Sequence, residues 1–193
     1  LNIPQDAVVI GSFQKDGNGW GEGDEPKLIK GPDVFLEVIA KLKPQIPNLW
    51  ILLSGPARGF VKNGLEKLGV PYQHKFLKHA SEIADLYDTL DLYIITSREE
   101  GGPKACLESM AKKVPLITTA VGQCQDLVQS GVNAMMVPID DIDGLYNASL
   151  KILGNRKLRD SLVTAGLATA KENSHESQLP LWKEYFKGLI NYD

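Results

Sequence analysis

Apolar residues along the chain fall into short runs that alternate with longer amphipathic stretches. Six short runs predict strands: Ala7–Phe13, Leu49–Ser54, Tyr72–Leu77, Leu92–Thr96, Pro115–Thr119 and Ala134–Val137. Several of them are almost continuously apolar, which is typical of strands that are covered on both faces of a parallel sheet. The pattern therefore favours a sheet buried between two layers of helices.

The stretches between these runs have the periodicity of helices. After the first run, Pro32 stands where a helix begins, and the apolar residues from Val34 to Leu42 share one face. Further helices are predicted at Phe60–Leu68, Ser81–Leu90, Pro103–Lys112 and Gln123–Gln129. Strands that alternate with helices of this length form right-handed βαβ units. The sequence therefore predicts an α/β fold with a doubly wound parallel sheet.

The pattern changes after Pro138. Asp140–Leu153 and Arg156–Lys171 predict two amphipathic helices without a strand between them. The final segment, residues 174–193, carries apolar residues on one helical face: Leu181, Trp182, Tyr185, Phe186, Leu189 and Ile190. That face can pack on the domain formed by residues 1–173 or dock on a partner domain, and the pattern leaves both alternatives open.

Composition narrows the class of protein. A chain of 193 residues with 43% apolar residues can form one domain with a full core, which excludes a disordered tail. A net charge of −3 gives no support for nucleic-acid binding. Two cysteines cannot form a disulfide framework, and no apolar run approaches the roughly 18 residues of a membrane span. We expect a cytoplasmic protein with at most peripheral contact with the inner face of a membrane. The chain starts with Leu1, and we expect a fragment of a longer protein.

Gly101-Gly102-Pro103 follows the fourth predicted strand and opens a helix. Ligands of open α/β sheets bind beyond the carboxyl ends of the strands. The glycines allow the backbone to approach a ligand closely, and proline fits the first helical turn. Free N–H groups and the helix dipole favour an anion such as phosphate there. Three lysines at the same edge can neutralise it: Lys15, Lys30 and Lys104.

Two glutamates flank this helix start. Glu100 precedes the glycines, and Glu108 lies near the second turn of the helix. Because ionised carboxylates only accept hydrogen bonds, they suit hydroxyl-rich ligands such as ribose and a sugar ring. Any one of these charges alone is ordinarily a solvated surface group, but their combination at one edge favours a site. An anion between two polyols is the outline of a nucleotide diphosphate sugar.

The pair Glu100 and Glu108, with seven residues between them, resembles the E-x7-E motif of retaining glycosyltransferases of the large GT-B family four. The resemblance covers about Val8 to Pro138 and includes other motifs in order: Lys30-Gly31, Phe76-Leu77, Ala80-Ser81, Leu86-Tyr87, Pro115 to Gly122, and Asp126-Leu127-Val128. It implies the Rossmann-like C-terminal domain of a two-domain enzyme, which binds the nucleotide-sugar donor. It also implies an N-terminal acceptor domain outside this chain, to which the final helix crosses back.

The resemblance implies a role for each matching residue. Glu108 would hold the ribose hydroxyls, and Glu100 would contact the hydroxyls of the donor sugar. Gly101 and Gly102 would offer N–H groups to the sugar and the diphosphate, and Lys30 would contact the diphosphate. Glu100 and Lys30 are thus the expected catalytic residues.

The same resemblance places the nucleobase beside the segment after the third strand, chiefly Leu77, Lys78 and Ala80, through backbone groups. The donor would be a UDP-, GDP- or ADP-sugar, and the family needs neither a separate cofactor nor a metal. The base, the sugar and the acceptor stay open.

Two departures from the family pattern concern the diphosphate. The family commonly has Gly-Arg after the first strand, whereas here Ser12 follows Gly11. Lys15 is the expected substitute for that phosphate-binding arginine. The usual Gly-Phe-Gly is replaced by Gly101-Gly102-Pro103, so one backbone N–H is lost at Pro103.

Other functional classes fit less well. A dinucleotide-binding oxidoreductase needs Gly-x-Gly-x-x-Gly and an acidic residue after the second strand, but residues 17–23 have alternating glycines and that strand ends in Ser54-Gly55. No Walker loop is present. The histidines lack metal-ligand spacing, although His79 is a candidate contact for the base, and Cys106 is expected in the core. A non-catalytic nucleotide-binding module, or another nucleotide-sugar enzyme such as an epimerase, stays an alternative.

Overall fold

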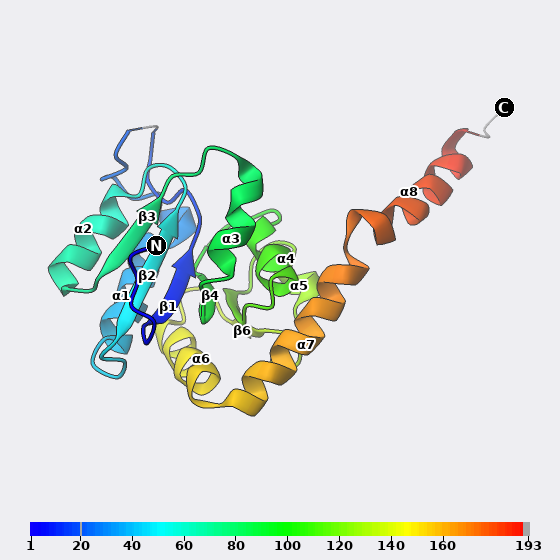
Figure 1. The fold of residues 1–193 in the computed structure, drawn as a ribbon. Helices are drawn as coiled ribbons and strands as arrows, with labels where there is room; N and C mark the ends of the chain where they lie inside the picture. The colour runs from blue at the N-terminus through cyan, green and yellow to red at the C-terminus, as the bar shows by residue number, and fades with distance from the viewer. Residues whose placement is uncertain (20, 191–193) are drawn as a thin grey trace.

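A computed structural model describes residues 1–19 and 21–190 (Figure 1). Trp20, in the loop after the first strand, and residues 191–193 of the predicted final segment lie outside the described residues. The described chain forms a six-stranded parallel sheet between two layers of helices, with the strand order β3-β2-β1-β4-β5-β6. The predicted doubly wound α/β fold is therefore confirmed.

All six predicted strands are present, each at its expected place. They are β1 (Val8–Ser12), β2 (Leu49–Ser54), β3 (Tyr72–Lys75), β4 (Leu92–Ile95), β5 (Leu116–Thr119) and β6 (Met135–Val137). β1 lies between β2 and β4, and Ile10 pairs with Ile51 on one side and Leu92 on the other. The strand order reverses between β1 and β4, so the crevice that binds ligands in such sheets opens beside the carboxyl ends of these two strands.

A different set of helices covers each face of the sheet. Buried side chains of α1 (Pro32–Leu42), α2 (Gly59–Leu68) and α6 (Ile142–Gly154) form one apolar cluster with the strands. α3 (Ile83–Tyr87), α4 (Lys104–Ala111), α5 (Cys124–Leu127) and α7 (Arg156–Glu172) contribute to a second cluster. Cys106 belongs to this second cluster and is fully buried, as expected of a core residue. The almost continuous apolar runs of the strands are explained by this two-sided burial.

Several predicted helices are shorter than their apolar pattern suggests. The stretch Ser81–Leu90 divides into a 3-10 turn, Ala80–Glu82, and α3. α5, predicted over Gln123–Gln129, has four residues. β3 ends at Lys75, two residues earlier than predicted, which frees Phe76 and Leu77 from the ladder. Side-chain caps set the starts of the later helices: Asp141 accepts the N–H of Gly144 (2.8 Å) at α6.

The last helix, α8 (His175–Ile190), extends away from the sheet, as the orange-to-red end of Figure 1 shows. Its aromatic residues contact each other instead of the domain: the ring centroids of Trp182 and Phe186 are 5.9 Å apart. Trp182, Tyr185 and Phe186 are each half exposed or more. The described aromatic side chains of α8 therefore do not pack on residues 1–173 in this structure, and docking on a partner domain stays a prediction. In the described part of the chain, no helix is both long and apolar enough to cross a membrane.

Candidate functional site

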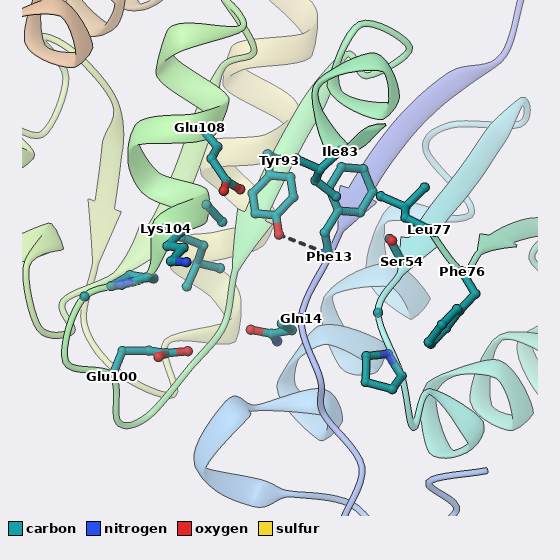
Figure 2. A pocket seen from close by; sticks show the side chains of 16 residues that line it. Phe13, Gln14, Ser54, Phe76, Leu77, Ile83, Tyr93, Glu100, Lys104 and Glu108 are labelled. Carbon is teal, nitrogen blue, oxygen red and sulfur yellow. Dashed lines mark hydrogen bonds between the residues drawn. The ribbon is translucent and has the colours of Figure 1, made fainter. Parts of the chain in front are cut away.

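A cavity of about 470 Å³ runs along the carboxyl edge of the sheet (Figure 2). It crosses the ends of four neighbouring strands. Phe76 and Leu77 follow β3, residues 54–56 lie at the end of β2, Phe13 and Gln14 follow β1, and six residues from Glu100 to Glu108 follow β4. The remaining wall is formed by Ile83, Tyr93 and Ile95. The cavity thus lies at the point where the strand order reverses, where the fold predicts a ligand site.

Six of the residues proposed from the sequence line this cavity: Leu77, Glu100, Gly102, Pro103, Lys104 and Glu108. Figure 2 shows the side chains of Glu100, Lys104 and Glu108 on one side of it, with Phe76 and Leu77 on the other. The fold thereby brings the motif residues into one cavity with the segment after β3, which is distant from them in the sequence.

The other proposed residues lie beside the cavity wall or beyond it. Lys30 reaches it through an ion pair with Glu100. Gly101 lies between the lining residues Glu100 and Gly102, and its carbonyl accepts the N–H of Gln123 (2.9 Å). Lys78 is exposed, and its N–H donates to Glu82 (3.3 Å), while Ala80 begins the 3-10 turn before α3. Lys15 is half-buried next to Gln14 without lining the cavity, so its role as a substitute for the arginine stays a prediction.

Lys30 and Glu100 form the charged centre of this edge. The ammonium group of Lys30 binds Oε1 of Glu100, and both side chains are largely buried. Ser97 donates its hydroxyl to the same carboxylate oxygen (3.1 Å). The amide of Gln14, which lines the cavity, donates to the carbonyl of Lys30 (2.9 Å). These contacts hold a cation and a carboxylate in fixed positions at the cavity mouth.

Gly31 allows Lys30 to reach this place. Its φ of +62° is in the left-handed region, and a Cβ there would lie 1.9 Å from the carbonyl oxygen of Thr96. Thr96 in turn donates its hydroxyl to the carbonyl of Gly31 (2.8 Å). Only glycine permits this close approach, which explains the Lys-Gly pair as a structural requirement of the site.

Arg98 links the loop that carries Glu100 to the start of α1 and to Asp140. Its guanidinium donates two hydrogen bonds to Asp33 at the start of α1 (2.8 and 2.7 Å) and also pairs with Asp140 (2.7 Å). The hydrogen bond from Arg98 lowers the pKa of Asp33, and the same bond raises the pKa of Arg98. The N–H of Arg98 donates to the carbonyl of Ile29 (2.8 Å), so both loops are locked together.

The helix start at α4 differs in one detail from the prediction. Pro103 has an extended backbone, with ψ of 109°, and is the N-cap residue, so the helix begins at Lys104. Its carbonyl accepts the N–H of Cys106 (2.9 Å). Gly122, with φ of +44°, packs so closely that a Cβ would lie 2.2 Å from the carbonyl oxygens of Glu100 and Gly101. The glycine turn is therefore braced from the β5 side.

Glu108 is oriented by a group that the sequence analysis assigned no role. The buried hydroxyl of Tyr87 donates to Oε2 of Glu108 (3.1 Å). Burial raises the pKa of Tyr87, so the phenol stays protonated and able to donate. Tyr87 packs against Phe13 and Tyr93, and the hydroxyl of Tyr93 accepts the N–H of Phe13 (2.8 Å). This aromatic cluster fixes both Glu108 and the chain that leaves β1.

Arg58 is a second residue that the sequence analysis missed, although it follows the end of β2. It is fully buried and donates to the carbonyls of Ser12 (2.7 Å), Gln14 (2.6 Å) and Ser54 (3.0 Å). It thereby fixes the backbone of Gln14 at the cavity wall. The signal that could have revealed it is an arginine between two apolar segments at the carboxyl edge.

The charge partner of Arg58 is Asp16, which is also buried. Nη2 of Arg58 lies 3.0 Å from Oδ2 of Asp16. Neither carboxylate oxygen of Asp16 has a hydrogen-bond partner with good geometry among the described residues, and Nε of Arg58 has none either. Burial therefore outweighs the attraction of Arg58 and raises the pKa of Asp16 to about 6.

The described side chains contain no group of three or more metal-binding residues. His74 donates from Nε2 to the carbonyl of Gly55 (2.8 Å), and burial lowers its pKa. His79, a candidate contact for the base, is exposed and does not line the cavity, and His175 begins α8.

The sequence model of a family described as "Glycosyl transferases group 1" matches residues 26–168. This range holds both glutamates, the glycine turn and most of the cavity wall. The chain belongs to this family. The group 1 chain resembles a lipopolysaccharide core biosynthesis mannosyltransferase, LpsB, of Rhizobium meliloti, with 28% identity over 153 residues, which are 75% of this chain and 44% of that protein.

Solved structures of glycosyltransferases have the same fold. The C-terminal domain of the group 1 protein LpcC from Francisella tularensis matches with a TM-score of 0.71 and 18% identity, covering 89% of this chain and 87% of that one. The Anabaena protein HepE, crystallised with UDP-glucose, matches with a TM-score of 0.71 and 21% identity, covering 86% of this chain and 44% of that one. The group 1 chain spans less than half the length of LpsB and HepE.

Proposed function

We propose that this group 1 chain is the donor-binding half of a retaining glycosyltransferase of the GT-B family four. The observation that carries the proposal is the cavity that joins a charged end, with Glu100, Lys104 and Glu108, to an apolar end across four strand ends. A nucleotide diphosphate sugar has the same division into a charged centre and an aromatic base. The complex of HepE with UDP-glucose supports this choice of ligand class.

The proposed chemistry is the transfer of a hexosyl group from the donor to an acceptor hydroxyl. The bond between the anomeric carbon and the diphosphate breaks, and the acceptor oxygen forms the new bond on the same face of the sugar while its hydroxyl proton passes to the leaving diphosphate. Lys30 and the start of α4 would stabilise the charge that develops on the leaving diphosphate, an example of electrostatic preorganisation. Lys104, at the first position of α4, stands where a cation adds to this effect.

The two glutamates would orient the donor. Glu108 would accept hydrogen bonds from the ribose hydroxyls, and Glu100 would accept them from the donor sugar. They are not proposed as the acid and nucleophile of a retaining glycosidase, because two carboxylates that hold separate rings of the donor do not both face the scissile bond.

The acceptor would bind to a preceding domain in the same cytoplasmic protein. Two observations support this part of the proposal: the chain spans 44% of the length of LpsB, and the aromatic face of α8 is exposed. Association with the inner face of a membrane would be peripheral.

Ligand-observed NMR and calorimetry with UDP, GDP, ADP and their sugars test the proposal on this chain. We expect one nucleotide and its sugar to bind in competition with each other, and no sugar to be transferred by the chain alone. If none of the nucleotides binds to the folded chain, the proposed function is wrong. Efficient transfer by the chain alone would contradict the assignment as half of an enzyme.

A further inference from the structure

The chain that leaves β1 is held from inside the domain by one buried side chain. Arg58, just before α2, donates to the carbonyls of Ser12 (2.7 Å) and Gln14 (2.6 Å). Its Nη2 group donates to the hydroxyl of Ser12 (3.1 Å) and lies 3.0 Å from the carboxylate of Asp16. Because the donors of a guanidinium have a fixed planar arrangement, one side chain holds three alternate residues of this segment in place.

The loop after this segment closes into a hairpin that leads back to Lys30. The carbonyl of Asp16 accepts the N–H of Lys27 (2.7 Å), and Gly17 pairs with Pro26 in an antiparallel bridge. The carbonyl of Lys27 then accepts the N–H of Lys30 in the following turn (2.8 Å). A shift of Asp16 is therefore passed along the backbone to the point from which the side chain of Lys30 starts.

This hairpin is packed on the residues that begin α2. The carbonyl of Glu22 accepts the N–H of Gly59 (2.6 Å), one of the N–H groups that have no partner within the helix itself. On the other side of the hairpin, a Cβ at Gly17 would lie 2.4 Å from the carbonyl oxygen of Ala57. Backbone thus packs directly on backbone, which leaves the hairpin one position relative to α2.

Gln14 provides a second connection from Arg58 to Lys30. Arg58 holds the backbone carbonyl of Gln14, and the side-chain amide of Gln14 donates to the carbonyl of Lys30 (2.9 Å). The hairpin and Gln14 therefore both connect the buried arginine to the same lysine, which forms the ion pair with Glu100.

Stability alone does not explain why this pair is ionic. The side chains of Arg58 and Asp16 are 0% and 1% exposed. The removal of one partner from such a pair is costly, but replacement of both partners by apolar residues is often neutral or stabilising. An apolar pair would lack the directed hydrogen bonds to the backbone that the guanidinium makes. The buried pair is therefore suited to precise placement of the chain around it.

We infer that Arg58 and Asp16 are positioning residues for the diphosphate of the donor, and that they act by setting the place of Lys30 at the cavity. The inference rests on the proposed function, in which Lys30 binds the diphosphate. Neither Arg58 nor Asp16 lines the cavity, so neither touches the ligand. Their effect reaches the ligand through the hairpin and Gln14.

Two substitutions loosen this arrangement in different ways. Arg58→Lys keeps a charge opposite Asp16, but a single ammonium group cannot reproduce the fork that holds the backbone of Gln14. Gly17→Ala leaves the buried pair intact and lifts the hairpin from Ala57. Because the second variant does not touch Arg58, it decides the question alone if Arg58→Lys does not fold.

Calorimetry measures binding of the nucleoside diphosphate, among UDP, GDP and ADP, that the unmodified chain binds. In both variants we expect its affinity to fall roughly 5- to 50-fold, within the range for residues coupled through a shared backbone segment. The matched controls are Arg156→Lys, in an exposed arginine, and Gly21→Ala, where a Cβ would meet no atom within 4 Å. Both controls should bind as the unmodified chain does. Circular dichroism establishes which variants are folded.

A third measurement separates positioning from a general loss of structure. Lys30→Ala removes the group through which the pair acts, so the addition of Gly17→Ala to Lys30→Ala should lower the remaining affinity by less than about twofold. A hairpin that merely supports the domain would cause the same fold-loss with and without Lys30. Ligand-observed NMR competition extends the comparison to weak affinities.

The possible outcomes distinguish this inference from the proposed function. If the unmodified chain binds a nucleotide and the folded variants bind it as tightly as their controls, the positioning role is wrong while the proposed function stands. The same fold-loss in the presence and absence of Lys30 also overturns the positioning role. If the unmodified chain binds no nucleotide, the proposed function fails and the inference fails with it.

Discussion

Lys30 and Glu100 form an ion pair at the mouth of the cavity, although they are 70 positions apart in the chain. One comes from the turn before α1 and the other from the loop after β4. Each group therefore neutralises the charge of the other in this structure. The donor, by the proposed function, has to engage both groups, so the pair sets how the site responds to substitution.

Substitution of Glu100 should separate nucleotide binding from sugar recognition. Glu100→Gln removes a carboxylate that repels the diphosphate and holds Lys30. We expect the free nucleoside diphosphate to bind as tightly as before or up to about tenfold more tightly, which is about 1.4 kcal/mol. The preference for the nucleotide sugar over the free nucleotide should fall. Calorimetry with both ligands measures this preference. If the ratio of the two affinities is unchanged in Glu100→Gln, the role of Glu100 is contradicted.

Loss of Lys30 should weaken both ligands together. A charge-assisted hydrogen bond to phosphate contributes roughly 1.5–3 kcal/mol, so Lys30→Ala should cost about that much binding free energy for the nucleotide and for its sugar. Lys157→Ala, an exposed lysine of α7, is the matched control. Equal affinities of Lys30→Ala and the control, in folded protein, would show that Lys30 does not contact the diphosphate.

Tyr87 should act through Glu108. Tyr87→Phe keeps the buried ring but removes the hydrogen bond to the carboxylate, which is worth roughly 0.5–1.5 kcal/mol. We expect the preference for a ribonucleotide over its 2′-deoxy analogue to fall in Tyr87→Phe and to disappear in Glu108→Ala. Competition binding with the two analogues measures this preference. A preference that both variants retain would place the ribose elsewhere.

Arg58 should be a major contributor to stability. It is fully buried, bonds three carbonyls and faces the carboxylate of Asp16. Arg58→Met leaves these acceptors and Asp16 without their donor, and breaking a buried pair in this way costs about 3–5 kcal/mol. Urea unfolding should show that loss, whereas Lys62→Met, a more exposed cation on α2, should change the unfolding free energy by less than about 1 kcal/mol. Similar values for both variants would contradict the role of Arg58.

The raised pKa of Asp16 should make stability depend on pH. The pKa of Asp16 rises from 3.8 to about 6 on folding, so the folded state holds the proton more tightly than the unfolded state. Its contribution to stability is complete below pH 3.8 and is lost as the pH rises through about 6. Compared with Asp16→Asn, the unmodified chain should therefore lose on the order of 2–3 kcal/mol of unfolding free energy between pH 4 and pH 7. Urea unfolding of both proteins at the two pH values checks this, and a constant difference would contradict it.

The aromatic face of α8 should contribute little to the stability of this chain. Trp182 is 55% exposed, so Trp182→Ser should change the unfolding free energy by less than about 0.5 kcal/mol. Leu162→Ala in the buried face of α7 serves as the contrast, with an expected loss of about 2–5 kcal/mol. A large loss in Trp182→Ser would show that α8 packs on its own domain in solution.

Sequence periodicity was sufficient for the architecture. The almost continuous apolar runs of the strands and the apolar faces of the helices depend on residues that are close together in the chain. The six strands and the order of the helices could therefore be predicted. The same holds for Glu100 and Glu108, because one loop and one helix carry both. Element ends were predicted less well: β3 ends before Phe76 because its ladder with β2 stops at Lys75, which no local pattern indicates.

The amino-acid sequence by itself determined the α/β alternation, the glycine turn at the start of α4 and the spacing of the two glutamates, since each follows from neighbouring residues. Tertiary structure decided which distant groups meet: Lys30 with Glu100, Tyr87 with Glu108 and Arg58 with Asp16. It also decided that Phe76 and the aromatic face of α8 stay uncovered. The physical reason is that such contacts depend on how whole strands and helices pack, and packing is set by all the faces of the domain together.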